Sequence, residues 1–303
     1  MRYNRNMYSA LITDADALVG LAKRQSELIP ATLRRRLEVF RANAAPSGCL
    51  LVKGLPIGDL APTPATPTTP TAKSNSTELL LLSVAALVGE PVGYKPEHGG
   101  DVIQNLVPVR SSSLRQTSTS SGVDLKFHTE AAFHPHRPKY LLLLCLRGDQ
   151  QARTTVASIH AALPHLDDDV IDVLFQARFR CAIDESYLHG RANSLGAPMA
   201  VLCGDRSNTA MVFDEDLMVG TDQEADDALR KLGAALSANH EGIVLEAGDL
   251  VILDNEMVVH GRSPFTPRFD GTDRWLQRAM VVSDLAASAS ERIGRMITTE
   301  FGD

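Results

Sequence analysis

Apolar residues in the first hundred positions recur mostly at helical spacing, which predicts a largely helical N-terminal part. One helix follows Thr13 or Asp14 as its N-cap, and a second has Pro30 in its first turn and continues through ATLRRRLEVFRANA. Gly48 then opens CLLVKGLPIG, a leucine-rich stretch bounded by glycine and proline that predicts a strand. The apolar run over residues 78–88 predicts a further helix.

Residues 61–77 interrupt this pattern with the sequence APTPATPTTPTAKSNST, whose four prolines exclude a helix or a central strand. A domain linker and a long surface loop are the two interpretations. We favour the loop, because the apolar helix after it needs a core that the short N-terminal part cannot supply.

From residue 101 onward the pattern changes to short apolar strands separated by Gly, Pro, Asp and Asn. Helices are predicted only at 167–176 and 222–238. The chain lacks a βαβα rhythm and a GxGxxG motif, which favours an antiparallel sandwich or barrel over a nucleotide-binding sheet. The predicted strands are DVIQNLVPV, LKFHTEAAF, KYLLLLCLRG, TTVASIH, ARFRCAI, PMAVLCG, AMVFDED, GIVLEAGDLVILDNEMVVHGR and RWLQRAMVVS.

We therefore expect a mainly β fold with flanking helices (α+β), forming a single domain over residues 1–303. Residues 1–100 are predicted to be a helical wrap containing the 61–77 loop, and residues 101–285 a β core with a helical insert. The composition agrees: 303 residues with 44% apolar and 22% charged side chains are typical of a globular protein.

The net charge of −7 argues against binding to nucleic acid or to an anionic membrane surface and favours a small-molecule partner. No apolar run approaches the ~20 residues of a membrane span, and the N-terminus lacks a secretory signal pattern. We expect a cytoplasmic protein, and nothing in the sequence fixes its oligomeric state.

The most informative motif is Phe127-His128-Thr129-Glu130. In a strand, residues i and i+2 share a face, so His128 and Glu130 would lie side by side. His260, at the end of the apolar stretch MVVHGR, is the candidate third ligand. Two imidazoles and one carboxylate on one face of a metal ion are typical of non-haem Fe(II) centres that activate O₂. An HxE tripeptide alone is more often a surface or core feature, so the distant histidine carries the argument.

Two further groups of charged residues are candidates for ligand contacts. Arg274 and Arg278 in DRWLQRAM share a face, and paired guanidiniums bind the carboxylates of small molecules; a pair of surface arginines around Trp275 is the alternative. Asp214 and Asp216 end the AMVFDED strand next to apolar residues and would also share a face. Solvated acids at a strand end are the alternative there.

Taken together, FHTEAAFHPHRPKYLLLLCLRGD, FDEDLMVG and MVVHGRSPFTPRFDGTDRWLQR resemble the clavaminate synthase-like branch of the Fe(II)/2-oxoglutarate-dependent oxygenases. The resemblance is to the arginine, lysine and asparagine hydroxylases of antibiotic biosynthesis, and it extends over most of the chain. It implies a distorted double-stranded β-helix, or jelly roll, with Fe(II) as cofactor and 2-oxoglutarate and O₂ as co-substrates.

The resemblance also implies roles for individual residues. The iron ligands would be His128, Glu130 and His260. Arg274 would bind the distal carboxylate of 2-oxoglutarate, assisted by a threonine of the TTVAS strand, Thr155 rather than Thr154. The substrate would contact Arg278 through its carboxylate, Gln104 at its backbone end, and Asp214 and Asp216 through a cationic side chain.

The expected reaction is hydroxylation of an unactivated C–H bond in a free amino acid that is basic or closely related to a basic one: arginine, lysine, citrulline or ornithine. An asparagine-type or carrier-bound substrate is the alternative among enzymes. A cupin-like sensor that binds metal and oxo acid without turnover is the alternative outside them.

Overall fold

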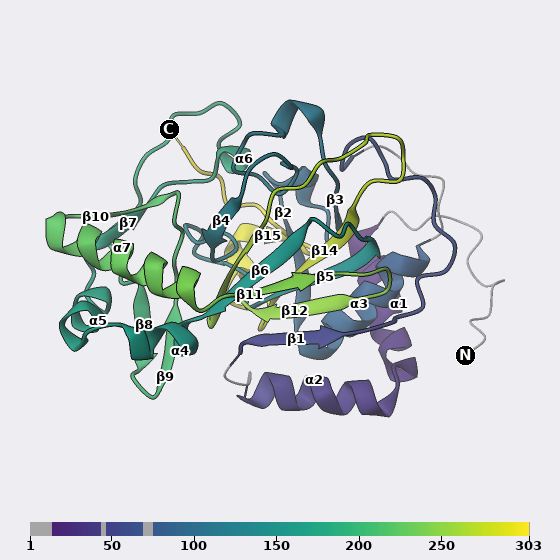
Figure 1. Cartoon of the computed structure of the whole chain (residues 1–303). Coiled ribbons are helices and arrows are strands. Elements are labelled where there is room, and N and C mark those ends of the chain that lie inside the picture. Colours follow the sequence, from purple (N-terminus) through teal and green to yellow (C-terminus); the bar gives the residue numbers. More distant parts are fainter. Residues whose placement is uncertain (1–13, 44–46, 69–74, 303) are drawn as a thin grey trace.

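Two antiparallel sheets form the centre of the computed structural model, which describes residues 14–43, 47–68 and 75–302 (Figure 1). The larger sheet has the strand order β1-β12-β5-β14-β2-β16-β15, with β3 pairing alongside β14, and only its β2–β16 pair is parallel. The smaller sheet has the order β11-β6-β13-β4. Its strands are β4 (Leu125–His128), β6 (Arg153–Ser158), β11 (Glu241–Val244) and β13 (Val258–Arg262).

The strands of the larger sheet come from both halves of the chain. They are β1 (Cys49–Val52), β2 (Glu90–Tyr94), β3 (Gln104–Leu106), β5 (Tyr140–Arg147), β12 (Leu250–Asp254), β14 (Trp275–Val282), β15 (Arg292–Ile293) and β16 (Met296–Ile297). Two further pairs lie outside these sheets: β7 (Phe179–Cys181) with β10 (Met218–Gly220), and β8 (Leu202–Asp205) with β9 (Asn208–Met211).

The two sheets pack face to face over an apolar core. Leu143 of β5, Leu253 of β12 and Met280 of β14 belong to the same buried cluster as Val156 of β6 and Val258 of β13. This arrangement confirms the predicted distorted double-stranded β-helix with flanking helices. The space between the sheets is where side chains from both can converge.

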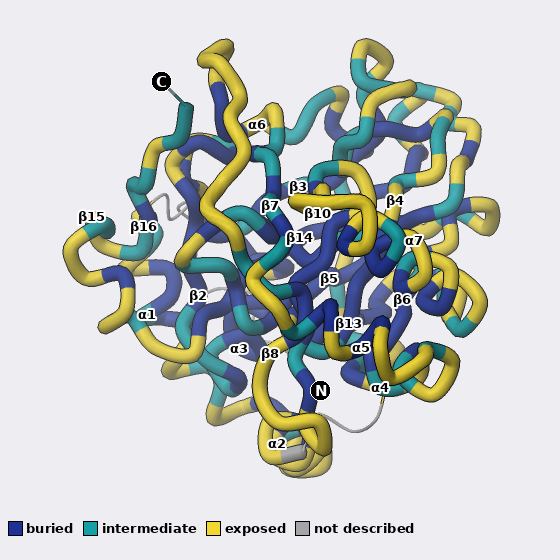
Figure 2. The backbone as a smooth tube through the Cα atoms, turned by 90° about the vertical axis from the view of Figure 1, so that its left-hand side faces the viewer, coloured by how far each residue is buried: buried dark blue, intermediate teal, exposed yellow. Residues whose placement is uncertain are grey.

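Helices cover both outer sides of this core. Helix α1 (Ala15–Gln25), α2 (Ala31–Asn43) and α3 (Ser76–Val88) pack against the larger sheet or against one another, and α3 is buried almost all round. On the opposite side lie α4 (Ile159–Ala162), α5 (Asp168–Leu174) and α7 (Gln223–Ala238), while the one-turn helix α6 is Glu185–Leu188. Figure 2 shows the central strands buried and α2 exposed along its outer side.

Local sequence signals explain most of the element boundaries. Asp14 caps α1 by accepting a hydrogen bond from the backbone of Ala17, whereas Thr13, the other predicted cap, lies outside the described residues. Pro30 directly precedes α2, and residues 61–68 form neither helix nor strand, as predicted. Residues 69–74 of the predicted loop are not described. The predicted end of the loop at residue 77 was wrong, because Ser76 and Thr77 already belong to α3. Strand β2 follows α3 immediately and was not predicted. No helix among the described residues could cross a membrane.

Candidate active site

Three potential metal ligands meet between the two sheets. His128 ends β4, His260 lies on the adjacent strand β13, and the two are register partners whose ring centroids are 4.3 Å apart. Together with Glu130 they offer ligand atoms that all lie within 4.8 Å of one another. The structure therefore brings together the three residues that the sequence singles out.

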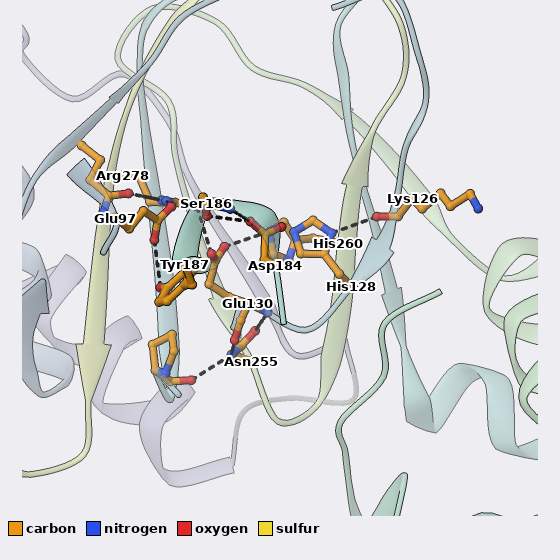
Figure 3. Close-up of polar contacts among 12 residues, drawn as sticks. Glu97, Lys126, His128, Glu130, Asp184, Ser186, Tyr187, Asn255, His260 and Arg278 are labelled. Carbon is orange, nitrogen blue, oxygen red and sulfur yellow. Dashed lines mark hydrogen bonds and ion pairs between the residues drawn. The ribbon is translucent and has the colours of Figure 1, made fainter. Parts of the chain in front are cut away.

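Glu130 reaches this position differently from the way the strand pattern predicts. Strand β4 ends at His128, and Glu130 lies in a turn whose next residue, Ala131, has φ of 52°. The side chain of Asn255 fixes this turn: its Oδ1 accepts from Glu130 N at 2.8 Å, and its Nδ2 donates to Glu130 O at 3.1 Å (Figure 3). The carboxylate of Glu130 is therefore positioned by hydrogen bonds to Asn255, a residue distant in sequence, and not by the alternation of side chains along a strand.

The surroundings favour the protonation states that a divalent cation requires. Burial lowers the pKa of His260 to about 4, with a further contribution from His128, so the imidazole is neutral. Burial alone would raise the pKa of Glu130, but Arg278, followed by His260 and His128, outweighs it and keeps the carboxyl ionised. His128 Nδ1 lies 2.8 Å from Lys126 O; as the donor there, it leaves Nε2 free as a ligand.

Unpartnered atoms support the same interpretation. Glu130 Oε2 and His260 Nδ1 are buried and have no hydrogen-bond partner among the described residues. The His260 Nε2 and Glu130 Oε2 atoms are 3.6 Å apart, longer than a hydrogen bond. A buried carboxylate oxygen without a donor is costly unless a cation binds it, so this donor set fits a resident Fe(II).

Arg274, directly before β14, is buried and has no carboxylate within ion-pair distance in the described part of the chain. Its guanidinium contacts Thr154 Oγ1 at 3.4 Å and lies 5.9 Å from the centre of the Phe265 ring. Burying a guanidinium without an anion is unfavourable, so an anionic ligand is expected here. This environment fits one carboxylate of 2-oxoglutarate.

The contact with Thr154 corrects the expectation that Thr155 assists Arg274. On β6, Thr155 is the register partner of Gly261, whereas Thr154 pairs with Arg262 and Val156 with His260. Alternation along the strand therefore puts Thr154 on the face of His260 and Thr155 on the opposite one. The prediction was wrong because the sequence does not show which of two adjacent threonines in a strand faces the interior.

A cavity of about 250 Å³ is lined by two of the three potential ligands, His128 and Glu130. Arg278 of β14 borders it and makes contacts with Glu97, Glu130 and Gln104, of which Arg278 Nε to Gln104 Oε1 measures 2.8 Å. Gln104 Nε2 is buried without a partner in the described chain. Arg274 and Thr154 do not line this cavity, so the two arginines serve separate regions.

Two aspartates line the cavity with no Lys or Arg partner among the described residues. Asp214 is buried, and its Oδ1 accepts from the backbones of Asp216 and Leu217 at 2.9 and 2.8 Å. Burial raises its pKa, although His128 opposes the shift. Asp184 accepts through Oδ1 from the backbone of Ser186 at 2.8 Å.

The segment around Asp214 also differs from the predicted strand. Strand β9 ends at Met211, and residues 215–217 form a turn, so the predicted alternation of faces does not apply. Asp216 does border the cavity, but it is exposed and forms an ion pair with Lys126 at 3.3 Å. Glu215 does not line the cavity.

Sequence reasoning missed several residues of the site, namely Glu97, Asp184, Tyr187 and Asn255. Each lies outside the motifs and reaches the site through a loop or a one-turn helix. The dipeptide Asp254-Asn255 before MVVHGR was the one local signal, since Asn side chains commonly bond to backbone groups in turns.

Comparisons with known proteins agree with this geometry. A profile of the family described as "Taurine catabolism dioxygenase TauD, TfdA family" matches residues 38–280. The chain is 40% identical to an L-asparagine oxygenase of Streptomyces coelicolor over 87% of this chain and 79% of the relative. It is 35% identical to an L-lysine 3-hydroxylase of Catenulispora acidiphila (90% and 78% covered) and 33% identical to clavaminate synthase 2 of Streptomyces clavuligerus (94% and 90%).

Among solved structures, the non-heme iron oxygenase OrfP in complex with Fe, succinate and (3S)-hydroxy-L-Arg superposes with a TM-score of 0.87. It is 30% identical, and the match covers 96% of this chain and 93% of that one. Fold, donor set and matches together define an iron- and 2-oxoglutarate-dependent dioxygenase. The chain belongs to the TauD/TfdA family, which confirms the resemblance found in the sequence.

Proposed function

We propose that this protein hydroxylates an unactivated carbon of a free basic amino acid, such as arginine, lysine or ornithine, with Fe(II) held by His128, Glu130 and His260. The observation that carries the choice of substrate is the pair Asp184 and Asp214. Both line the cavity, and neither has a Lys or Arg partner in the described chain. A cationic side chain in the cavity would supply the missing counter-charge.

Arg278, which also lines the cavity, suits the backbone end of an amino acid, because it supplies a guanidinium for the α-carboxylate. Gln104, which contacts Arg278, has a buried Nε2 without a partner in the described chain that can supply a second donor. With its carboxylate held there and its cation at Asp184 and Asp214, the substrate extends past the metal ligands. The chain between those two anchors is therefore the part presented for reaction.

Arg274 and Thr154 provide the separate site for the distal carboxylate of 2-oxoglutarate. When bound, the iron supplies the oxidising chemistry, in which O₂ and 2-oxoglutarate are consumed and succinate and CO₂ are formed. The protein itself provides position and charge complementarity. It needs no protein nucleophile, and the sequence has no GxSxG motif.

A neutral, asparagine-type substrate is the second candidate. It is favoured by the 40% identity to an L-asparagine oxygenase. An aspartate that accepts hydrogen bonds from an amide would serve that substrate equally well, so chemistry at Asp214 must decide between the two. The carrier-bound substrate and the non-catalytic sensor of the sequence analysis are further outcomes of the same test.

The decisive comparison is between arginine and citrulline, which have nearly the same shape but differ in charge. Loss of a buried charge pair costs about 2–5 kcal/mol, so kcat/KM is expected to be roughly 30- to several-thousand-fold higher for arginine than for citrulline. If lysine or ornithine is the substrate, the same ratio is expected between that cation and a neutral analogue of it. Asp214→Asn should remove most of this preference, and Glu215→Gln, on the neighbouring residue, should leave it unchanged.

Preference for asparagine over every basic amino acid would refute the basic substrate and leave the oxygenase class intact. Reaction only with a carrier-linked amino acid would refute the free substrate. Absence of succinate formation with every amino acid tested would favour the sensor.

A further inference from the structure

Helix α6 and the segment after β16, residues 298–302, lie side by side at one end of the molecule (Figures 1 and 2). The two are more than a hundred residues apart in sequence. Helix α6 has only four residues, and its C-cap, His189, adopts a left-handed conformation with φ of 48°. A single turn is not stable by itself, so tertiary contacts must hold α6 in place.

Aromatic contacts form one half of this interface. The ring of Phe301 lies 5.2 Å from Phe133, 5.2 Å from His134 and 6.1 Å from Tyr187, measured between centroids and in edge-to-face geometry. Tyr187 belongs to α6, and its ring also meets Phe133 at 4.9 Å. Phe301 therefore completes a cluster around the buried face of α6.

Ion pairs form the other half. Glu300 Oε2 accepts from Arg191 at 2.9 Å and Glu300 Oε1 accepts from Lys95 at 2.7 Å. Arg191, three residues after α6, also donates to the backbone oxygen of Phe301 at 3.2 Å. Hydrogen bonds from Lys95 and Arg191 lower the pKa of Glu300 to about 2, so it remains ionised at neutral pH.

The same helix reaches the site through Tyr187. Its hydroxyl donates to Glu97 Oε2 at 3.1 Å, and the other oxygen of Glu97 pairs with Arg278 (Figure 3). Asp184, Ser186 and Tyr187 all line the cavity. The substrate side of the site is thus built on an element whose position depends on residues 298–302.

We propose that Glu300 and Phe301 are positioning residues for the amino acid substrate. They clasp α6 against the core, so that Tyr187 and Glu97 hold Arg278, and Asp184 faces the cavity. They touch neither the metal ligands nor Arg274, so they act on the amino acid and not on 2-oxoglutarate. The inference deepens the proposed function and rests on it for the identity of the substrate.

The test compares Phe301→Ala, Phe301→Tyr, Glu300→Gln and, as a control, Ile293→Ala. Ile293 is 70% exposed and belongs to the same terminal part of the chain. Limited trypsin digestion tests the contact of residues 300 and 301 with α6 directly. Arg191 is bonded to Glu300 and Phe301, and the segment after it is exposed and has no helix or strand, so loss of these bonds should expose the peptide bond after Arg191 to cleavage. Cleavage after Arg191 should be faster in Phe301→Ala and Glu300→Gln, and unchanged in Ile293→Ala.

Steady-state kinetics measure how the same variants change the KM for the amino acid and the KM for 2-oxoglutarate. In Phe301→Ala the KM for the amino acid should rise about ten- to a hundredfold while the KM for 2-oxoglutarate stays within about twofold, because only the substrate side is displaced. Phe301→Tyr keeps the ring and should restore both cleavage resistance and KM. Glu300 is exposed, so Glu300→Gln is expected to fold normally, and melting temperatures check all variants.

If Phe301→Ala and Glu300→Gln are cleaved after Arg191 at the same rate as the wild type, Glu300 and Phe301 do not hold α6 in place, whatever the enzyme's substrate. Faster cleavage with an unchanged KM for the amino acid would refute the positioning role. If the wild type hydroxylates no amino acid, the proposed function fails, and the tryptic comparison still decides whether the clasp exists.

Discussion

At the scale of single residues, the proposed Fe(II) site requires His128, Glu130 and His260 to act as one donor set. Replacing any one of them by Ala should abolish Fe(II)-dependent turnover and weaken Fe(II) binding under anaerobic conditions, because an octahedral ion loses one of three protein ligands. The fold should persist, since the strands that carry the histidines pack through apolar residues. Full product formation by any of the three purified variants would remove that residue from the ligand set.

Arg274 and Thr154 give a second test at this scale. Arg274→Lys replaces a planar guanidinium, which can form two parallel hydrogen bonds to a carboxylate, by a single ammonium group. Each charged hydrogen bond lost costs of order 1.5–3 kcal/mol, so the KM for 2-oxoglutarate should rise steeply. Thr154→Val should raise that KM as well, whereas Thr155→Val, whose side chain lies on the other face of β6, should not. The opposite ranking of the two threonine variants would return the role to Thr155.

The residues of the site differ in how far sequence alone could predict them. His128, Glu130 and His260 carry a spacing and a chemistry that only a few functions need. Thr154 could not be distinguished from Thr155, because the choice depends on the phase of a strand. Asp184 and Glu97 could not be predicted, because loops far apart in sequence bring them to the site, and for Asn255 the sequence offered only the turn signal of Asp254-Asn255.

At the scale of elements, the two strands that carry the histidine ligands approach each other closely where β13 passes β4. The register shifts between His260 and Arg262, and a Cβ at Gly261 would lie 2.4 Å from Leu125 O and 3.0 Å from Thr155 Oγ1. Gly261→Ala must therefore push β4 away from β13, and these two strands carry His128 and His260. We expect a loss of about 1–3 kcal/mol in the free energy of unfolding, together with weaker Fe(II) binding.

Gly242→Ala is the matched control on β11 of the same sheet, where the nearest atom to the added Cβ is Arg153 Cδ at 3.4 Å. Urea unfolding and anaerobic Fe(II) titration of both variants measure the two effects. Equal behaviour of the two alanine variants would show that the contact between β13 and β4 does not position the metal ligands.

Element positions were predicted more successfully than their ends. Most strands lie within the predicted segments because apolar alternation and Gly or Pro boundaries are local signals. The ends of β4 and β9 were wrong, because hydrogen bonds from Asn255 and the Asp214 turn replace strand pairing at those points. These two misplaced ends lie at the site itself, where function imposes irregular backbone.

At the scale of the whole molecule, His134 should make stability depend on pH. It is fully buried, and its pKa is lowered to about 3, first by burial and then by His136. The unfolded chain takes up this proton near pH 6.5, so stability is present above that pH and is lost progressively as the pH falls towards 3. Between pH 7 and pH 5 the contribution amounts to about 2 kcal/mol.

His134→Asn retains an acceptor for the backbone N–H of His136 but no longer titrates. The difference between pH 7 and pH 5 in the free energy of unfolding should therefore be about 2 kcal/mol smaller in this variant than in the wild type. Identical pH dependence in the two proteins would mean that His134 has the same pKa in the folded and the unfolded state.

The general architecture was predictable because residues 101–285 repeat one signal, short apolar strands without βαβ units, after a largely helical N-terminal part. The pairing of strands from both halves of the chain into one sheet was not, since strand order depends on contacts that no local pattern records. The resemblance to a known family implied a double-stranded β-helix, and the two sheets of the structure confirm that fold.

The most direct test of the central claim is the stoichiometry of the reaction. Protein reconstituted anaerobically with Fe(II) and 2-oxoglutarate is mixed with air-saturated buffer and a panel of free amino acids, and succinate and amino acid products are quantified together. We predict one succinate for each amino acid that gains one oxygen atom, with a basic amino acid as the best substrate and no product without Fe(II). Succinate formation that is the same with and without every amino acid of the panel would contradict the account.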